Sequence, residues 1–361
     1  MRSGWLTTGP VTKAFEKEFA QFIGVNECLA VSSATAGLHL ALRAINLQAG
    51  DQVLVPVNTF VATAEVIRYF DADPIFIDID YDSMNLSIEA LEIYLKNHDI
   101  SKLKAIMPVH IAGQACDMDP IITIAHNHNL FVIEDAAHAF PCKYKDKLIG
   151  SLDSDFTVYS FYATKTITTG EGGMLIAKDQ SHIDLIKKLR LHGISKEVWD
   201  RYTSSKGHLP YDVDVLGFKY NLSDLCSSIG RVQLKKAQSF YAKRSKIANQ
   251  YNEAFKNLDL QLPMQKRLDD QHAWHLYLIR VNDSSKRDSI VDALNKKGIG
   301  TSLHFIPLHL LTYYKETYHL SEDLFPTAMR SFQSLISLPI YTKMTDDEIS
   351  YIIESVQELC S

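Results

Sequence analysis

Lys165 lies in the stretch YSFYATKTITTGEGGMLIA, residues 159–177, between two apolar segments that both read as strands. Hydroxyl side chains and the turn Gly170-Glu171-Gly172-Gly173 follow it. A lysine taken at random is a solvated surface residue, but this apolar approach favours a partly buried ammonium group. Burial lowers the pKa of a lysine and frees its amine to attack a carbonyl carbon. Lys165 is therefore a candidate nucleophile.

Asp135 closes the apolar run LFVIED, and the residues AAHA follow it. Two interpretations of this carboxylate remain open. It could cap a helix that begins within AAHA. Alternatively, it could be a buried anion that keeps a proton on the ring nitrogen of a heterocyclic ligand, which makes the ring a better electron sink.

The segment SSATAG, residues 32–37, precedes a predicted helix of small residues. Its hydroxyl residues are typical helix caps, yet the same helix start would offer N–H groups and a positive dipole end to a phosphate. Phe60 follows another strand and is either a core residue or a side chain that stacks on a flat ring. A phosphate-binding helix start, an aromatic ring, an aspartate and a lysine, each after a strand, are together what a pyridoxal phosphate (PLP) site requires.

The elements that must position these residues follow a regular pattern. Predicted strands alternate with predicted helices. The strands are expected at 28–31, 51–56, 74–79, 104–109 and 130–135, and the helices at 12–23, 35–45, 59–70, 88–97 and 120–128. This alternation is typical of a mostly parallel sheet, which binds its ligands at the carboxyl ends of the strands. A long helical region at 222–254, a strand in HAWHLYLIRV and a helix at 286–297 follow. We expect a large α/β domain, residues 1–235, and a smaller α+β domain, residues 236–361.

The composition excludes several other classes of protein. The 361 residues carry 43 acidic against 37 basic side chains, with no basic block, so we expect no nucleic-acid partner. We expect no membrane span and no signal peptide, because no apolar stretch is long enough and the start MRSGWLTTGP lacks an apolar core. Five scattered cysteines without CxxC spacing fit a reducing cytoplasm. His126 and His128 would point to different helix faces, so we expect no metal site there.

Seven motifs in order carry a family resemblance: SGWLTTGP, AVSSATAGLHLAL, EDAAHAF, SF followed by ATK, TGEGG, GFKYNLSDL and HAWHLYLIRV. With them the chain resembles the DegT/DnrJ/EryC1/StrS sugar aminotransferases over essentially its whole length. That family has the aspartate-aminotransferase-like PLP fold, fold type I. Within the family, the chain looks most like the ArnB-type enzymes, which aminate a UDP-4-keto-pentose. The segments that carry this likeness are SGWLTTGP, EDAAHA, GFKYNLSDL, HAWHLY and GIGTSLHF. Members of the family usually carry a longer segment before SGWLTTGP, so we expect an unusual or incomplete N-terminus.

The resemblance implies roles for residues of the cofactor site. Lys165 would bond to the cofactor and later move a proton, Asp135 would pair with the pyridine nitrogen, and Phe60 would stack on the ring. The cofactor phosphate would bind Thr35 and Ala36 with help from Ser160, and His138 would lie beside the cofactor. The segment GFKYNLSDL would reach the neighbouring subunit's site in a homodimer, where either Lys219 or Asn221 would touch the phosphate.

The resemblance also implies a substrate. Trp5, Thr8 and His304 would lie near a sugar nucleotide. L-Glutamate would donate its amino group to a nucleotide-linked 4-keto sugar, a UDP-sugar in ArnB-type enzymes, for lipopolysaccharide or another cell-envelope polysaccharide. Some family members are dehydratases with histidine in place of the lysine, so Lys165 favours transamination. Alternatives left open are an aminotransferase for a dideoxyhexose and a non-catalytic relative with a regulatory role.

Overall fold

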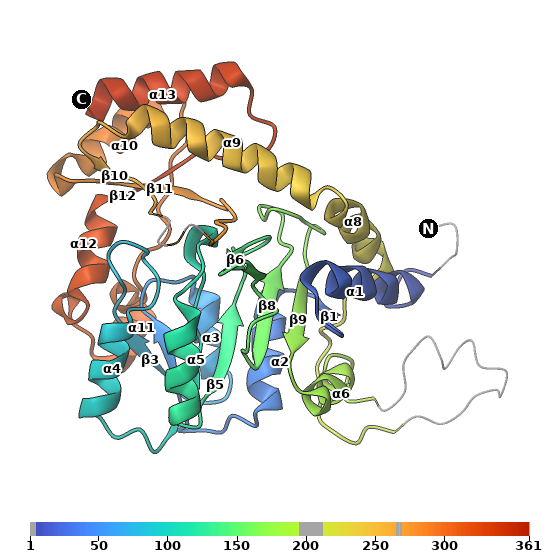
Figure 1. Ribbon diagram of the computed structural model, residues 1–361. Coiled ribbons are helices and arrows are strands. Elements are labelled where there is room, and N and C mark those ends of the chain that lie inside the picture. The colour runs from blue at the N-terminus through green and yellow to red at the C-terminus, as the bar shows by residue number, and fades with distance from the viewer. Residues whose placement is uncertain (1–4, 195–211, 265–266, 268, 361) are drawn as a thin grey trace.

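The large part of the chain is built on one seven-stranded sheet. The computed structural model describes residues 5–194, 212–264, 267 and 269–360 (Figure 1). The strands of the sheet are β1 (Leu29–Val31), β9 (Gly173–Ala177), β8 (Phe156–Ser160), β5 (Phe131–Asp135), β4 (Leu103–Ile106), β2 (Gln52–Pro56) and β3 (Asp73–Ile77), in that spatial order. From β8 to β3 all neighbours are parallel, whereas β1 and β9 pair antiparallel at the other edge. The expected mostly parallel sheet is confirmed.

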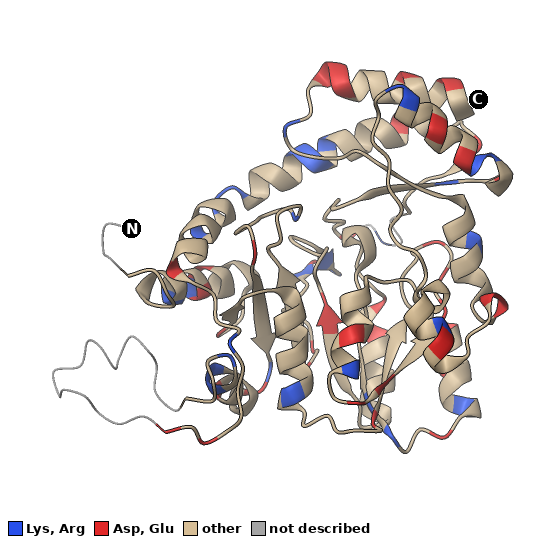
Figure 2. Cartoon of the chain, turned by 180° about the vertical axis from the view of Figure 1, so that it is seen from behind, with Lys and Arg blue, Asp and Glu red and all other residues tan. Residues whose placement is uncertain are grey.

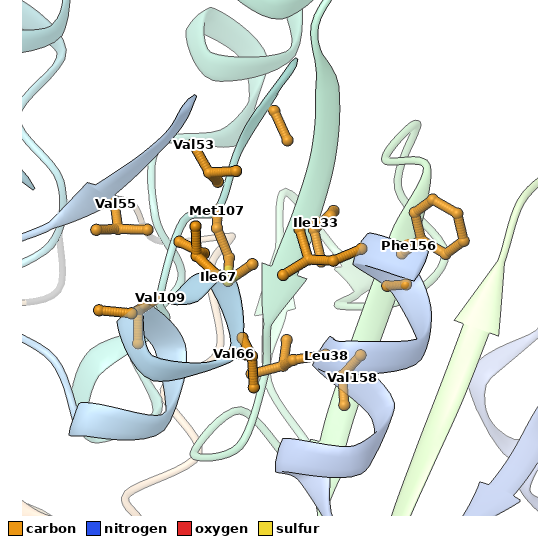
Figure 3. Packing of buried hydrophobic residues seen from close by; sticks show 14 of the residues in the cluster. Leu38, Val53, Val55, Val66, Ile67, Met107, Val109, Ile133, Phe156 and Val158 are labelled. Carbon is orange, nitrogen blue, oxygen red and sulfur yellow. The ribbon is translucent and has the colours of Figure 1, made fainter. Parts of the chain in front are cut away.

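Helices cover both faces of this sheet, because its central strands are apolar on both sides. One face packs against α2 (Ala34–Ala44), α3 (Val61–Arg68) and α6 (Gln180–Leu189), and Figure 3 shows Leu38, Val66 and Ile67 meeting strand residues such as Ile133 and Val158. The other face packs against α1 (Pro10–Ile23), α4 (Ile88–Asn97) and α5 (Met118–Asn127). The result is a three-layer sandwich whose strand ends remain free of these helices.

The C-terminal part forms a second core around a three-stranded antiparallel sheet, β10 (Leu260–Gln261), β11 (Tyr277–Val281) and β12 (Leu335–Leu338). The helices α9 (Ala237–Phe255), α10 (Arg287–Lys296) and α13 (Asp346–Cys360) pack on this sheet. Between α10 and β12 the chain returns to the large sheet, where Tyr314 of α11 (Thr312–Tyr318) meets Phe76 of β3; α12 (Pro326–Ser334) follows. The proposed domain boundary near residue 235 thus lies in the α8–α9 junction, but the core of the large part includes C-terminal residues.

Two expectations from the sequence were wrong in detail. The single helical region predicted at 222–254 is two helices, α8 (Asp224–Leu234) and α9, which separate at Lys235 and Lys236. The break lets α8 lie on α1 while α9 turns toward α13 (Figure 1). The strand predicted for HAWHLYLIRV begins only at Tyr277, because residues 272–276 are bonded to another loop instead.

The segment 142–150 is a short hairpin of β6 (Lys143–Tyr144) and β7 (Lys147–Leu148), as its turn residues indicate. Acidic and basic positions are interspersed over the chain, and the acidic end of β5 lies in the middle of the sheet (Figure 2). All five cysteines are free thiols. Among the described helices, none combines the length and the apolar character that crossing a membrane would require.

Candidate active site

A cavity of about 390 Å³ opens at the carboxyl ends of the parallel strands. It is the place where the ligand of such a sheet is expected. Most of the side chains that the sequence singled out line it, and they come from five separate loops. These lining residues are Thr35, Phe60, Asp135, His138, Ser160, Lys165 and His304.

The start of α2 forms one wall of this cavity. Ser33 is its N-cap and accepts a hydrogen bond from the amide of Ala36 at 3.0 Å. The helix start rests directly on β9, since a Cβ atom added at Gly173 would lie 2.8 Å from the carbonyl carbon of Ser33. The first N–H groups of a helix lack partners within it and attract a phosphate. Thr35 faces the cavity, whereas the amide of Ala36 is already held by the cap, so its predicted phosphate contact stays a prediction.

Asp135 is 5% exposed and lies at the end of β5. Its Oδ2 atom accepts a hydrogen bond from Thr63 at 2.8 Å, and its Oδ1 atom accepts one from the amide of Ala137 at 3.1 Å. Burial raises the pKa of Asp135, and these donors together with the charges of Lys165 and His110 oppose that rise. The helix-cap interpretation is wrong, because residues 136–139 form a turn and not a helix. The carboxylate is thus available to a protonated ring nitrogen.

Lys165 enters the cavity from a tight loop between β8 and β9. The loop is closed by hydrogen bonds from the amide of Phe161 to Gly172 at 2.8 Å and from the amide of Thr169 back to Phe161 at 3.0 Å. At Gly172 a Cβ atom would lie 2.3 Å from the Thr169 hydroxyl, so a larger residue there would displace that side chain. Burial lowers the pKa of Lys165 to about 8, and the attraction of Asp135 only partly opposes it. A large fraction of the amine is therefore neutral and nucleophilic near pH 8.

Aromatic rings form another wall of the cavity. His138 and His304 were expected there; His275 and Phe305 were missed. His275 lies in the motif HAWHLY. A polar residue within this apolar, strand-like motif was a signal of a site residue, but the periodicity of apolar residues does not detect it. Phe60 is 57% exposed and lies 5.8 Å from Phe305, ring centre to ring centre. Its stacking role stays a prediction.

Four predicted residues form a separate group beside the cavity. Asn221 donates a hydrogen bond to the hydroxyl of Thr8 at 2.5 Å, and the Trp5 indole donates one to the carbonyl of Thr8 at 3.1 Å. Lys219 bonds to the side-chain oxygen of Asn221. This strand-like segment runs along β1, with the amide of Ser32 bonded to the carbonyl of Tyr220 at 2.7 Å. Within one chain Trp5, Thr8, Lys219 and Asn221 do not line the cavity.

A lysine with a lowered pKa, a buried carboxylate and a helix start in one cavity are the combination that a PLP enzyme needs. A family model described as the DegT/DnrJ/EryC1/StrS aminotransferase family matches residues 1–357, and the chain belongs to this family. It is 44% identical to the uncharacterised protein MJ1066 of Methanocaldococcus jannaschii, across 100% of this chain and 93% of that protein. It is 42% identical to the spore coat polysaccharide biosynthesis protein SpsC of Bacillus subtilis, across 99% and 92% of the two chains.

Solved structures agree with this assignment. Spr1654 of Streptococcus pneumoniae, assigned as a sugar aminotransferase, superposes in its PMP-form with a TM-score of 0.91 and 32% identity, covering 99% of this chain and 94% of that one. The same protein has been solved in a PLP-form. The cofactor of the present protein is thus pyridoxal phosphate, and the protein is an aminotransferase. These relatives do not single out the ArnB-type branch that the motifs suggested.

The residues present fit this cofactor. The carboxylate of Asp135 would accept a hydrogen bond from the ring nitrogen, the start of α2 would hold the phosphate, and the amine of Lys165 would bond to the aldehyde carbon. The Nδ1 atom of His138 is buried and has no hydrogen-bond partner among the residues described, as expected of a group that contacts a ligand. When bound, the cofactor supplies an electron sink for transfer of an amino group.

Proposed function

We propose that this protein transfers an amino group from L-glutamate to the keto carbon of a nucleotide-linked 4-keto sugar. The observation that carries the proposal is the pairing, in one cavity, of a lysine amine with a lowered pKa and a buried carboxylate. The likeness to SpsC supports a product used in a surface polysaccharide. A cytoplasmic location agrees with the five free cysteines.

Each residue of the site has its own role in the transfer. The carboxylate of Asp135 keeps a proton on the ring nitrogen, and Thr63 and Ala137 keep that carboxylate ionised and oriented. In the first half of the reaction the Nζ atom of Lys165 would accept the proton from the carbon that carries the donor's amino group and pass it to the cofactor. In the second half it would move a proton from the cofactor to the sugar carbon that becomes aminated. Thr35, with the amides of the α2 start and Ser160, holds the phosphate. The aromatic wall excludes water from these transfers.

The sugar would lie over the aromatic wall, near His304. The Nδ1 atom of His304 bonds to the hydroxyl of Ser337 at 2.9 Å, which fixes the ring beside Phe305 at the cavity. Neutral imidazole and hydroxyl groups recognise sugar hydroxyls through hydrogen bonds. A UDP-pentose and a UDP-, GDP- or dTDP-linked dideoxyhexose are both compatible with this wall, since few contacts decide between them.

We further propose a homodimer with shared sites. Leu225, Ile229 and Val232 follow one another at i, i+4 and i+7 on α8 and are 43%, 44% and 52% exposed, so they form one apolar face. That face lies next to the segment carrying Lys219 and Asn221. A second copy packed on α8 would bring this segment to the partner's cofactor phosphate, together with Trp5 and Thr8.

The test is an assay with a panel of keto-sugar nucleotides and L-glutamate, using PLP-loaded protein beside Lys165→Ala. We expect stoichiometric 2-oxoglutarate and amino sugar with at least one UDP-sugar, and neither product with the variant. Formation of 2-oxoglutarate from glutamate alone, in an amount equal to the enzyme, would establish the donor independently of the sugar. Bound PLP without release of 2-oxoglutarate would instead favour the non-catalytic alternative.

A further inference from the structure

His275 belongs to a loop that is held in place more firmly than its lack of regular structure suggests. The amide of His275 donates to the carbonyl of Ala112 at 2.9 Å, and the amide of Ala273 donates to the carbonyl of Gly113 at 2.7 Å. The buried guanidinium of Arg244 donates to the carbonyls of Trp274 and His275 at 2.9 and 3.2 Å. The backbone of His275 is therefore fixed from two sides.

The loop that carries Ala112 and Gly113 has an unusual backbone conformation where it meets the segment of His275. Ala112 and Gly113 have φ angles of 58° and 95°, and Trp274 has a φ angle of 53°. A Cβ atom at Gly113 would lie 2.9 Å from both the carbonyl oxygen of His138 and the Cβ atom of Ala273. Left-handed conformations at residues other than glycine persist only where the surroundings enforce them. Gly113 thus lies against both the backbone of His138 and the segment that carries His275.

The side chains of the two histidines meet inside the cofactor cavity. Their ring centroids lie 4.3 Å apart with 41° between the planes, and Phe305 approaches the ring of His138 at 5.8 Å and 25°. His138 and His275 are 8% and 7% exposed, and both line the cavity. In each ring the Nδ1 atom is buried without a hydrogen-bond partner in the described part of the chain. Two adjoining rings that each keep an unbonded buried nitrogen indicate a functional site, since buried polar atoms are otherwise bonded.

Burial, together with the charges around the pair, keeps both rings neutral. Burial lowers the pKa of His138 well below its usual range, and the neighbouring charges of Lys165 and His304 act in the same direction. Burial likewise lowers the pKa of His275, with His138, Lys165, Arg244 and His304 adding to the effect. The carboxylates that line the cavity are those of Asp135 and Glu171.

We propose that His275 is a positioning residue of the cofactor site, which holds the ring of His138 in one plane and so fixes the nitrogen that His138 offers beside Lys165. A ring confined by His275 and Phe305 loses the freedom to turn about its terminal torsion, which is otherwise broad. The inference rests on the proposed place of His138 beside the cofactor. It adds a residue from the C-terminal part that need not touch the cofactor itself.

The experiment is a pH titration of the visible absorption band of the PLP-loaded full chain. The variants are His275→Phe, His138→Phe, the double variant, and His275→Asn, whose amide can occupy the place of Nδ1. His272→Asn is the matched control, because His272 is buried in the same segment but does not line the cavity. Its ring accepts a hydrogen bond from the amide of Trp274 at 2.9 Å, which asparagine can also accept. Circular dichroism and thermal unfolding report folding.

We expect His275→Phe to shift the apparent pKa of the band by about 0.5 unit or more, a roughly threefold change in the acid dissociation constant. The double variant should shift no further than His138→Phe alone, because His275 acts through His138. His275→Asn should recover part of the wild-type value, and His272→Asn should keep it.

Two results would overturn the inference. One is a folded His275→Phe protein, or His275→Asn where the former does not fold, whose band titrates as in the wild type. The other is a double variant whose shift equals the sum of the single shifts, which would mean that the two rings act independently. A wild-type protein without any band would instead contradict the proposed function, so the two failures are distinguishable.

Discussion

The hydroxyl of Thr63, near the start of α3, donates a 2.8 Å hydrogen bond to the Oδ2 atom of Asp135, which lies 72 positions later in the chain at the end of β5. Thr63 is itself bonded to the hydroxyl of Thr59 at 2.8 Å. The bond offsets the effect of burial on this carboxylate. It makes Thr63 a direct partner of a residue that lines the cavity, although no motif in the sequence indicated this.

Replacing Thr63 by valine should weaken PLP binding by roughly tenfold. The change removes a hydrogen bond to a charged group, worth about 1.5–3 kcal/mol, with little change of shape. Equilibrium titration of apo-protein with PLP measures the effect. Thr59→Val is the comparison: it removes a hydroxyl from the cavity lining but leaves the bond from Thr63 to Asp135, so its loss of affinity should be smaller. Equal affinities for wild type and Thr63→Val would show that Asp135 does not depend on this donor.

Capture of PLP by the apo-protein should follow the ionisation of Lys165. Only the neutral amine attacks, so below the pKa the rate should rise about tenfold per pH unit and then level off above pH of about 8. Stopped-flow absorption between pH 6 and 10 measures this profile. A free lysine derivative is the reference, and its rate should keep rising toward its ordinary pKa of 10.5. A protein profile that follows the free derivative would contradict the lowered pKa.

Gly173→Ala should loosen the start of α2. The added Cβ atom would lie 2.8 Å from the carbonyl carbon of Ser33 and 2.9 Å from the amide nitrogen of Ala34, both of which are backbone atoms that cannot move alone. Such overpacking costs about 1–3 kcal/mol, so we expect lower stability in denaturant and weaker binding of PLP. Gly300→Ala is the matched control, since no atom lies within 4 Å of its added Cβ atom. Equal stability of both variants would mean that α2 tolerates the displacement.

Val232→Asp should convert the proposed dimer to monomers. The charge would be placed at the C-terminal end of the apolar face of α8, where burial against a second copy would be costly. Sedimentation velocity measures the change. Ile93→Asp on α4, where Ile93 is 53% exposed, is the control and should leave the oligomeric state unaltered. A wild-type monomer, or a Val232→Asp dimer, would exclude this face as the contact between copies.

The sequence predicted the parts of the site that are set by local pattern. Lys165, Asp135 and the start of α2 all follow apolar strands, and strand ends of a parallel sheet meet at one edge. The helix that one of the two interpretations placed after Asp135 is absent because the chain there turns, with the amide of Ala139 bonded to the carbonyl of Ala136 at 2.9 Å. His275 and Phe305 escaped prediction because their place depends on contacts between distant segments. Neither periodicity nor spacing encodes such contacts.

The contact between residues 112–113 and 273–276 has a consequence for the order in which the active site forms during synthesis of the chain. The cavity wall includes side chains from the last quarter of the chain, among them His304 and Phe305. A ribosome-bound chain that has emerged only as far as the large sheet would carry Lys165 and Asp135 in an open, wet groove. The site would close only when synthesis is nearly finished. Tight binding of PLP should therefore occur late in synthesis. It would show that the whole polypeptide has been made and folded.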